Sequence, residues 1–429
     1  MHEQILEADL TFTGERFEPG VQVSIGKDGR IAAVGRLGSK PTRRLEGRAL
    51  LPGMVNVHSH AFQIGLRGRG ENYPEGTGDF WSWREAMYRL AGDLDPGRFQ
   101  ELCLRAFREM RRGGITAVGE FHYLHHSGKG ADFELDDRLL AAASEAGIRL
   151  VLLEAYYSIG GIGKPLAGAQ SRFATKSPEA YWSQIDRLAG RLDPGLQSLG
   201  AAAHSIRAAG LDEIIDLHTE SRRRGMIFHM HVEEQEAEIR DCVLSYGGTP
   251  MKLLNQRLEI DSAFTAIHCT HTAGEEMERF LALGGNVCIC PLTEAALADG
   301  IADAPRIHHA GARISIGTDC NARISMLEEA RWLEYVQRLD RRRRGILRDR
   351  SGNLALPLFQ AATLNGARAL GLAAGRIAPG LWADLTAIDL TSPLLAGAVP
   401  DTLLEAILFG VSEEVVAATC VGGKWEERP

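Results

Sequence analysis

Short apolar runs alternate with amphipathic stretches through most of the chain. The runs occupy residues 54–59, 115–121, 149–156, 198–204, 226–232, 264–268, 286–290 and 313–317. Most of them are apolar at nearly every position, which is typical of parallel strands buried on both faces. Intervening stretches such as 99–112 and 211–224 repeat apolar residues with the helical period. Eight strands alternating with helices predict an α/β protein with a (β/α)₈ TIM-type barrel. A doubly wound open sheet is the alternative, and the lack of a G-x-G-x-x-G sequence after the first strand disfavours it.

The two ends of the chain follow a different pattern. Residues 8–13, 21–25 and 31–35 read as short strands separated by Gly and Asp turns, and similar segments recur near the C-terminus. Because chain ends often lie close together, we expect one small β-sandwich domain built from both ends. The expected domains are therefore residues 1–52 with 375–429 for the β-sandwich, and residues 53–374 for the barrel.

The composition of the chain limits which kinds of partner we expect it to have. The net charge of −8 lacks the basic footprint of a nucleic-acid-binding protein. The sequence contains no apolar stretch of about 18 residues or more, so no membrane span is expected. Residues 1–10 do not resemble an export signal, and the seven cysteines show no disulfide framework. These observations predict a cytoplasmic protein that acts on a small molecule.

Potential metal ligands gather where four of the predicted strands end. The first strand ends in His58-Ser59-His60, whose two imidazoles share one face because alternate strand residues point the same way. The fifth carries His229 and His231, the sixth ends at His268, and the eighth leads into Asp319. Barrel enzymes place their active sites at these strand ends, and imidazole and carboxylate are ligands that suit Zn²⁺.

A single histidine at a strand end is more often a hydrogen-bonded polar residue than a metal ligand. Here four strand ends carry His or Asp together, which makes coincidence a poor explanation. His229 and His231 lie on the same face, so spacing alone does not choose between them. We select His231 because it lies nearer the C-terminal end of its strand and hence nearer the barrel mouth.

The sequence LPGMVNVHSH at residues 51–60 resembles the first-strand signature of the amidohydrolase superfamily. The other strand ends complete the resemblance, which covers nearly the whole chain. It implies His58, His60, His231 and Asp319 as metal ligands, and Glu234, His268 and Asp319 as catalytic residues, with Glu234 as the proton shuttle. Strands three and four offer Glu154 and His204 but no lysine to bridge two metals. One zinc ion per chain is therefore expected, with iron as the alternative metal.

Further segments resemble one branch of that superfamily, the formimidoylglutamate deiminases. They include Ala61-Phe62-Gln63, residues 79–88, residues 119–126 and residues 203–207. The resemblance implies that the substrate is bound by Gln63, Arg84, Tyr123, His204 and Arg207. It also implies a homodimer in which Arg84 reaches the neighbouring subunit's site. One departure stands next to Glu234, because the branch has alanine where this chain has Glu233.

Without the resemblance, these residues have plainer interpretations. Arg207 is equally well explained by a structural ion pair, and Gln63, Tyr123 and His204 by support of the metal ligands. The aromatic residues of the 81–88 segment more often indicate packing than ligand contact. An Arg fork does, however, suit a substrate carboxylate, which N-formimidoyl-L-glutamate has and a purine lacks.

The reaction implied is hydrolysis of N-formimidoyl-L-glutamate to N-formyl-L-glutamate and ammonia, a step of histidine degradation. One alternative is a relative that deaminates an aromatic ring, such as guanine or S-adenosylhomocysteine. The other is a non-catalytic barrel, which is disfavoured because none of the expected ligands is missing.

Overall fold

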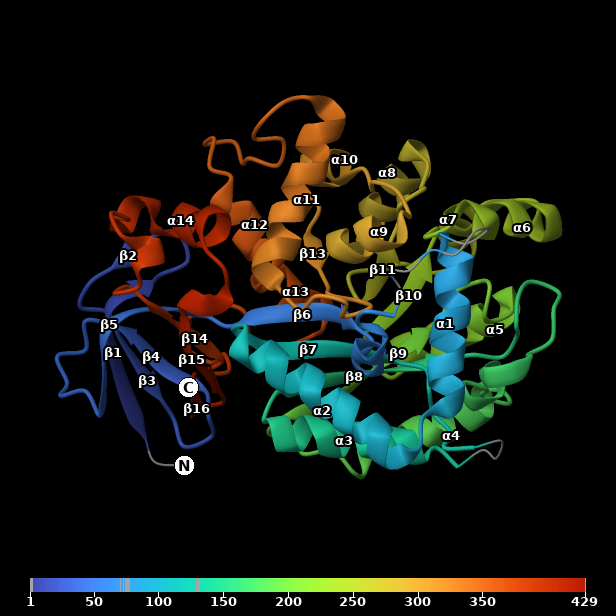
Figure 1. Ribbon diagram of the computed structural model, residues 1–429, viewed down its shortest axis with the longest axis horizontal. Coiled ribbons are helices and arrows are strands. Elements are labelled where there is room, and N and C mark those ends of the chain that lie inside the picture. Colours follow the sequence, from blue (N-terminus) through green and yellow to red (C-terminus); the bar gives the residue numbers. More distant parts are fainter. Residues whose placement is uncertain (1–2, 70, 72, 74–77, 129–131, 429) are drawn as a thin grey trace.

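The computed structural model describes residues 3–69, 71, 73, 78–128 and 132–428. These residues form two parts, a barrel and a smaller sheet beside it (Figure 1). Within the described residues, no helix combines the length and the apolar character that crossing a bilayer requires.

The barrel confirms the predicted fold. Its eight parallel strands follow one another in chain order, from β6 to β13. Their bounds lie close to those of the predicted apolar runs, and the longer ones are buried at every position. The strands are β6 (Met54–Ser59), β7 (Ile115–His122), β8 (Arg149–Tyr156), β9 (Gln197–Ala203), β10 (Phe228–Val232), β11 (Phe264–His268), β12 (Asn286–Ile289) and β13 (Ile314–Ile316).

The barrel closes where its first and last strands meet. Ser59 and Asp319 form a parallel bridge there, and the Asp319 amide donates a hydrogen bond of 2.9 Å to the His58 carbonyl. Gly317 permits this approach, because a Cβ atom at this residue would lie 2.7 Å from the His58 carbonyl oxygen. The closure therefore brings the His58–His60 segment, at the end of β6, against Asp319.

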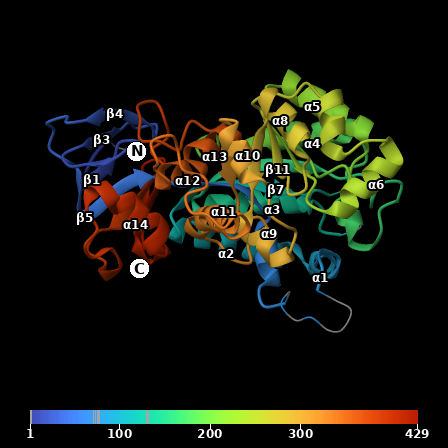
Figure 2. The same ribbon diagram turned by 90° about the horizontal axis from the view of Figure 1, so that it is seen from above.

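Helices surround the barrel strands (Figures 1 and 2). Most of them follow their strand and present an apolar face to it, as the helical period predicted. They are α2 (Pro96–Arg112), α3 (Glu134–Ala146), α4 (Pro178–Ala189), α5 (Leu211–Arg223), α6 (Glu236–Tyr246), α7 (Pro250–Arg257), α8 (Gly274–Ala282), α9 (Pro291–Leu297), α10 (Ala304–His309), α11 (Met326–Arg341), α12 (Ala355–Ala361) and α13 (Leu364–Ala369), with the 3₁₀ turns η1 (Ala61–Leu66) and η2 (Gly168–Arg172).

An additional helix, α1 (Phe80–Asp93), lies between β6 and α2. This helix was not predicted from the sequence. Asp79 begins the helix with a capping box, in which its side chain accepts a 2.8 Å hydrogen bond from the Ser82 amide. In Figure 1, α1 runs across the part of the barrel where the strands end. The helix thereby forms one wall of the cavity described below.

The two chain ends together build the smaller sheet, as expected. Its strands form one connected sheet that is antiparallel except where β1 pairs with β5, and they share a second small core. Residues 1–2 and 429 of the expected domain lie outside the described residues. The elements are β1 (Gln4–Phe12), β2 (Phe17–Glu18), β3 (Gln22–Ile25), β4 (Ile31–Gly35), β5 (Arg43–Pro52), β14 (Leu385–Asp389), β15 (Val416–Val421) and β16 (Lys424–Glu427), with η3 (Pro393–Leu395), η4 (Pro400–Thr402), α14 (Leu403–Gly410) and η5 (Glu413–Val415).

A buried ion pair joins this sheet to the barrel. Arg149 at the start of β8 donates to both oxygens of Asp384, over 2.6 and 3.0 Å. The pair is almost fully buried, with side-chain exposures of 3% and 1%, and the guanidinium lies 4.1 Å from the centre of the Trp382 ring. The β14 side of the smaller sheet is thus tied to the end of the barrel opposite the candidate site.

Candidate metal centre and active site

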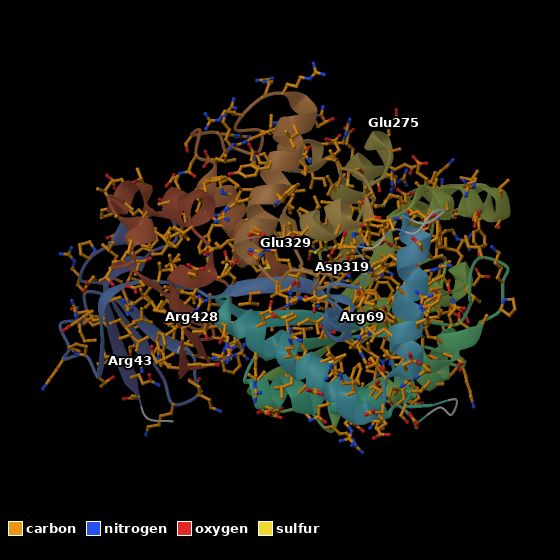
Figure 3. The ribbon with its side chains drawn as sticks, viewed as in Figure 1. Arg43, Arg69, Glu275, Asp319, Glu329 and Arg428 are labelled. Atoms are coloured by element: carbon orange, nitrogen blue, oxygen red, sulfur yellow. The ribbon has the colours of Figure 1, made fainter. Side chains whose placement is uncertain are left out.

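Four buried side chains converge at the barrel mouth. Each of His58, His60, His231 and Asp319 offers one ligand atom, and these atoms all lie within 4.8 Å of one another. Asp319 Oδ1 lies 3.3 Å from His58 Nε2 and 3.2 Å from His60 Nε2. Figure 3 shows Asp319 deep among the barrel strands. Three imidazoles and one carboxylate form a set that could hold a divalent metal.

Backbone hydrogen bonds orient two of the imidazoles. His60 Nδ1 donates to the Phe121 carbonyl over 2.8 Å, and His231 Nδ1 donates to the His204 carbonyl over 2.8 Å. Each bond fixes the tautomer that leaves Nε2 free to bind a metal. Burial lowers the pKa of His58 to about 3 and that of His231 well below its usual range. His58 and His231 are therefore neutral, which is the form that binds metals.

His229 lies on the same strand but outside this cluster. Its Nε2 donates to the Ala369 carbonyl over 3.0 Å, which directs the ring toward α13. The structure thus brings His231, and not His229, to His58, His60 and Asp319, in the arrangement selected from the sequence.

The site contains strained backbone at two predicted catalytic positions. His268 has a φ of 72° and Asp319 a φ of 45°, which are values that favour glycine. At Asp319 the backbone is held from both sides, because its amide donates to the His58 carbonyl and its carbonyl accepts from the His60 amide, each over 2.9 Å. Such strain persists only where the surroundings impose it, and it is characteristic of functional sites.

His268 and Glu234 lie next to the ligand cluster. His268 Nε2 is 3.9 Å from Glu234 Oε1 and 3.8 Å from Asp319 Oδ2, and it has no hydrogen-bond partner among the described residues. Its other nitrogen, Nδ1, lies 3.4 Å from Glu294. Burial lowers the pKa of His268, but the carboxylates of Glu234, Glu294 and Asp319 raise it to about 10.

Glu234 is ion-paired in this structure. Arg207 Nη2 donates to Glu234 Oε2, and Arg207 Nη1 lies 3.8 Å from Glu238 Oε2. Charge attraction from these carboxylates raises the pKa of Arg207 against the effect of its burial. Arg207 therefore lies at the candidate site, in contact with the predicted proton shuttle.

A cavity of about 190 Å³ opens above the ligand cluster. All five residues predicted to bind substrate line it, together with His60, His231, Glu234 and Asp319; the five are Gln63, Arg84, Tyr123, His204 and Arg207. Gln63 Nε2 donates to the Tyr123 hydroxyl over 2.8 Å, and the buried Gln63 Oε1 lacks a partner among the described residues. An unused acceptor facing a cavity is available to a ligand.

The residues of α1 face this cavity. Phe80, Trp81, Trp83 and Arg84 all line it, so aromatic residues for which packing was the plainer interpretation also form its wall. The Arg84 guanidinium lies 4.4 Å from the centre of the Trp81 ring and belongs to the cavity of its own chain.

Sequence reasoning missed several lining residues. Tyr157 follows the end of β8, and Glu238 lies four residues after Glu234. Gln170 Nε2 donates to the hydroxyls of Tyr157 and Tyr88 over 3.0 and 3.1 Å, which fixes both rings in the wall. The position of Tyr157 at a strand end was a usable signal, whereas nothing local indicated that α6 turns Glu238 inward.

A buried cluster around Asp136 and the side chain of Glu233 both lie outside the wall of the cavity. His122 and His125 both bond to Asp136 Oδ1, over 3.0 and 3.1 Å, in a fully buried cluster that also contains Glu154. None of these four residues lines the cavity. Glu233, the departure from the branch pattern, accepts a 2.9 Å hydrogen bond from the Met251 amide at the start of α7. Its side chain is directed to that helix.

A closed (β/α)₈ barrel with a three-histidine, one-aspartate set at its mouth defines the class of metal-dependent barrel hydrolases. Comparison with known proteins gives the particular family. The chain belongs to the amidohydrolase family, whose sequence model matches residues 49–425. This finding confirms the resemblance noted in the sequence.

The curated relatives include two kinds of deaminating enzyme. The chain is 36% identical to formimidoylglutamate deiminase from Pseudomonas aeruginosa, over 98% of this chain and 94% of that protein. It is 30% identical to a 5-methylthioadenosine/S-adenosylhomocysteine deaminase from Natronomonas pharaonis, over 92% of this chain and 85% of the relative.

Solved structures give the same fold. An amidohydrolase from Brucella melitensis superposes with a TM-score of 0.88 at 33% identity, covering 98% of this chain and 94% of the other. An adenosine deaminase from Xanthomonas campestris with bound zinc has a TM-score of 0.81 at 24% identity, covering 98% of this chain and 92% of the other, and supports the fold alone.

Proposed function

We propose that this chain is a formimidoylglutamate deiminase, which hydrolyses N-formimidoyl-L-glutamate to N-formyl-L-glutamate and ammonia. The observation that carries the proposal is the largely buried Arg207 in the wall of the cavity, directly above the metal-ligand cluster. A fixed guanidinium at this point suits a substrate that carries a carboxylate beside its reacting group. The 36% identity to the Pseudomonas aeruginosa enzyme over nearly the whole chain supports the same substrate.

The proposed metal is one zinc ion per chain, with iron as the alternative. His58, His60, His231 and Asp319 would hold it, and the Nδ1 bonds of His60 and His231, which leave their Nε2 atoms unprotonated, fit this role. When bound, the metal would supply Lewis-acid activation of the attacking water and the amidine.

The side chains beside the ligands would move the protons. Water adds its oxygen to the amidine carbon, the carbon–nitrogen bond breaks, and both protons of the water leave with the ammonia. Glu234 would take a proton at a carboxylate oxygen and deliver it to the departing nitrogen. His268 and Asp319, whose facing atoms lie 3.8 Å apart, would orient the water and take its other proton, which also passes to the departing nitrogen.

The five lining residues would hold the substrate. Arg207 and Arg84 would bind its two carboxylates, and Gln63 Oε1 would offer an acceptor to its nitrogen atoms. A homodimer and a cytoplasmic location belong to the same proposal. Light scattering of the purified protein tests the dimer, and a monomeric enzyme with full activity would exclude a contribution of Arg84 from a second subunit.

Deamination of an aromatic ring is the second candidate, because a relative named as a methylthioadenosine and S-adenosylhomocysteine deaminase is 30% identical. The two are separated by ammonia release from formimidoylglutamate, S-adenosylhomocysteine and guanine under the same conditions. We expect turnover of formimidoylglutamate alone. Preference for either neutral ring system would refute the deiminase proposal and leave the family assignment intact.

A further inference from the structure

Two carboxylates compete for one guanidinium in the wall of the cavity. Arg207 donates through Nη2 to Glu234 Oε2, while its Nη1 lies 3.8 Å from Glu238 Oε2. The three side chains are 15%, 7% and 0% exposed, respectively. Because they are largely shielded from water, exchange of partners among them depends on what enters the cavity.

The pairing with Arg207 restricts Glu234. A carboxylate that accepts a charge-assisted hydrogen bond from a guanidinium is held away from other partners. The other oxygen, Oε1, is 3.9 Å from His268 Nε2, which is beyond hydrogen-bonding distance. In this structure, the residue proposed to move the proton is therefore bound by the residue proposed to bind the substrate.

Glu238 is a second possible ion-pair partner for Arg207. Both of its carboxylate oxygens are buried without hydrogen-bond partners among the described residues, and the side chain lines the cavity. Burial raises the pKa of Glu238 to about 7, although the nearby Arg207 opposes this. Arg207 Nη1 also lacks a hydrogen-bond partner among the described residues, and it lies 3.8 Å from Glu238 Oε2. Arg207 can thus keep a carboxylate partner when its contact with Glu234 is broken.

We propose that a substrate carboxylate releases Glu234 from Arg207, with Glu238 as the positioning residue that holds the guanidinium during the exchange. This inference rests on the proposed function, since it assumes an amidine substrate that carries a carboxylate. The incoming carboxylate replaces Glu234 Oε2 on the fork of Arg207, and Glu234 becomes free to accept a proton. An amidine or ring that lacks a carboxylate leaves Glu234 bound, so recognition of the carboxylate controls turnover as well as affinity.

The experiment separates the carboxylate from the reacting group. N-propylformamidine carries the amidine alone, and propionate supplies the carboxylate as a separate molecule. In the wild-type zinc enzyme, we expect propionate to increase N-propylformamidine turnover saturably, on the order of 10- to 100-fold, which is the factor that a charge-assisted hydrogen bond is worth. Chloride at the same ionic strength should have no such effect.

Two variants test which residues are responsible for the activation by propionate. Arg207→Met should lose activation by propionate, and the exposed Arg98→Met serves as the matched control that keeps it. Glu238→Gln should retain activation but require more propionate for half of the effect, because Arg207 then has only Glu234 to hold it. If Glu238→Gln merely disturbs packing, it will lower turnover with and without propionate and leave the propionate concentration for half of the effect unchanged. That result would overturn the role of Glu238.

The proposal is overturned if propionate leaves wild-type turnover of N-propylformamidine unchanged or only inhibits it, or if Arg207→Met still responds. Formimidoylglutamate is assayed in parallel. Suppose the wild type hydrolyses formimidoylglutamate but its turnover of N-propylformamidine does not respond to propionate. That result would refute the release of Glu234 and leave the proposed function standing. Failure to hydrolyse formimidoylglutamate would refute the proposed function itself.

Discussion

The rings of His231 and His268 stack at a centroid distance of 5.5 Å and an interplanar angle of 15°. Their nitrogen atoms are nevertheless oriented differently. His231 is tied through Nδ1 to the His204 carbonyl and directs Nε2 into the ligand cluster, whereas His268 directs Nδ1 to Glu294. Two adjacent imidazoles at neighbouring strand ends are therefore suited to different tasks, one to bind the metal and one to act beside it.

Metal content distinguishes His231 from its neighbour on the same strand. We expect His231→Ala to lose most of the bound zinc, because one of the four ligand atoms is removed. His229→Ala should retain about one zinc per chain, since its ring is bonded to Ala369 outside the cluster. Elemental analysis after dialysis measures both. Loss of zinc from the His229 variant, or its retention in the His231 variant, would reverse the assignment.

Glu234→Gln should retain zinc and lose turnover by about 10²- to 10⁴-fold, the usual contribution of an acid–base group. The amide has nearly the same size as the carboxylate but cannot carry the proton. Steady-state kinetics with formimidoylglutamate and zinc analysis of the same preparation provide the measurement. A rate near that of the wild type would exclude Glu234 from proton transfer.

Substitution of Arg207 should impair turnover of formimidoylglutamate without loss of metal. Arg207→Met removes a charge-assisted contact typically worth about 1.5–3 kcal/mol, and more because the buried Glu234 then lacks its counter-charge. Arg207→Lys should recover only part of kcat/KM, because an ammonium group lacks the planar fork. Normal kinetics for Arg207→Met would contradict the proposed substrate.

The buried pair between Arg149 and Asp384 should matter for stability rather than for catalysis. Arg149→Met leaves Asp384 buried without its partner and should lower the free energy of unfolding by about 3–5 kcal/mol. Arg98→Met breaks an exposed pair and should change it by less than about 0.5 kcal/mol. Denaturant unfolding compares the two, and equal effects would show that burial of the pair is unimportant.

Acid should destabilise the protein through His218. This imidazole is packed between Phe228 and Phe264, and burial lowers its pKa from 6.5 to about 4. The unfolded chain therefore binds the proton more readily, so stability is full above pH 6.5 and falls as the pH drops toward 4. Between pH 7 and 5 the loss should be about 2 kcal/mol, and His218→Leu should remove it. An unchanged acid dependence in this variant would contradict the assignment.

The barrel could be predicted because its strands carry their own signal. Every position of β7 and β8 is buried, and most of them are apolar. Helix α1 was not recognised, although Asp79 and Ser82 form its capping box, because its aromatic residues obscured the helical period. The aromatic wall of the cavity could therefore not be anticipated.

The candidate site was predictable where its residues lie on strands. His58 and His60 follow from the alternation of side chains at the end of β6. His231 had to be chosen over His229 because it lies nearer the end of its strand. The contact of Arg207 with Glu234 joins two separate loops, and the approach of Glu238 depends on how α6 packs. Such relationships arise only from tertiary structure, and the sequence contains no local signal for them.

The pairing of β5 with β14 has a consequence for how the chain is made. Leu51 lies opposite Thr386, and only Gly53 separates β5 from the first strand of the barrel. Until the C-terminal strands have been synthesised, one edge of β5 has no partner within the chain, and an open strand edge invites pairing with other molecules. Nascent chains of this protein therefore depend on β14, near the C-terminal end, to protect β5 from aggregation.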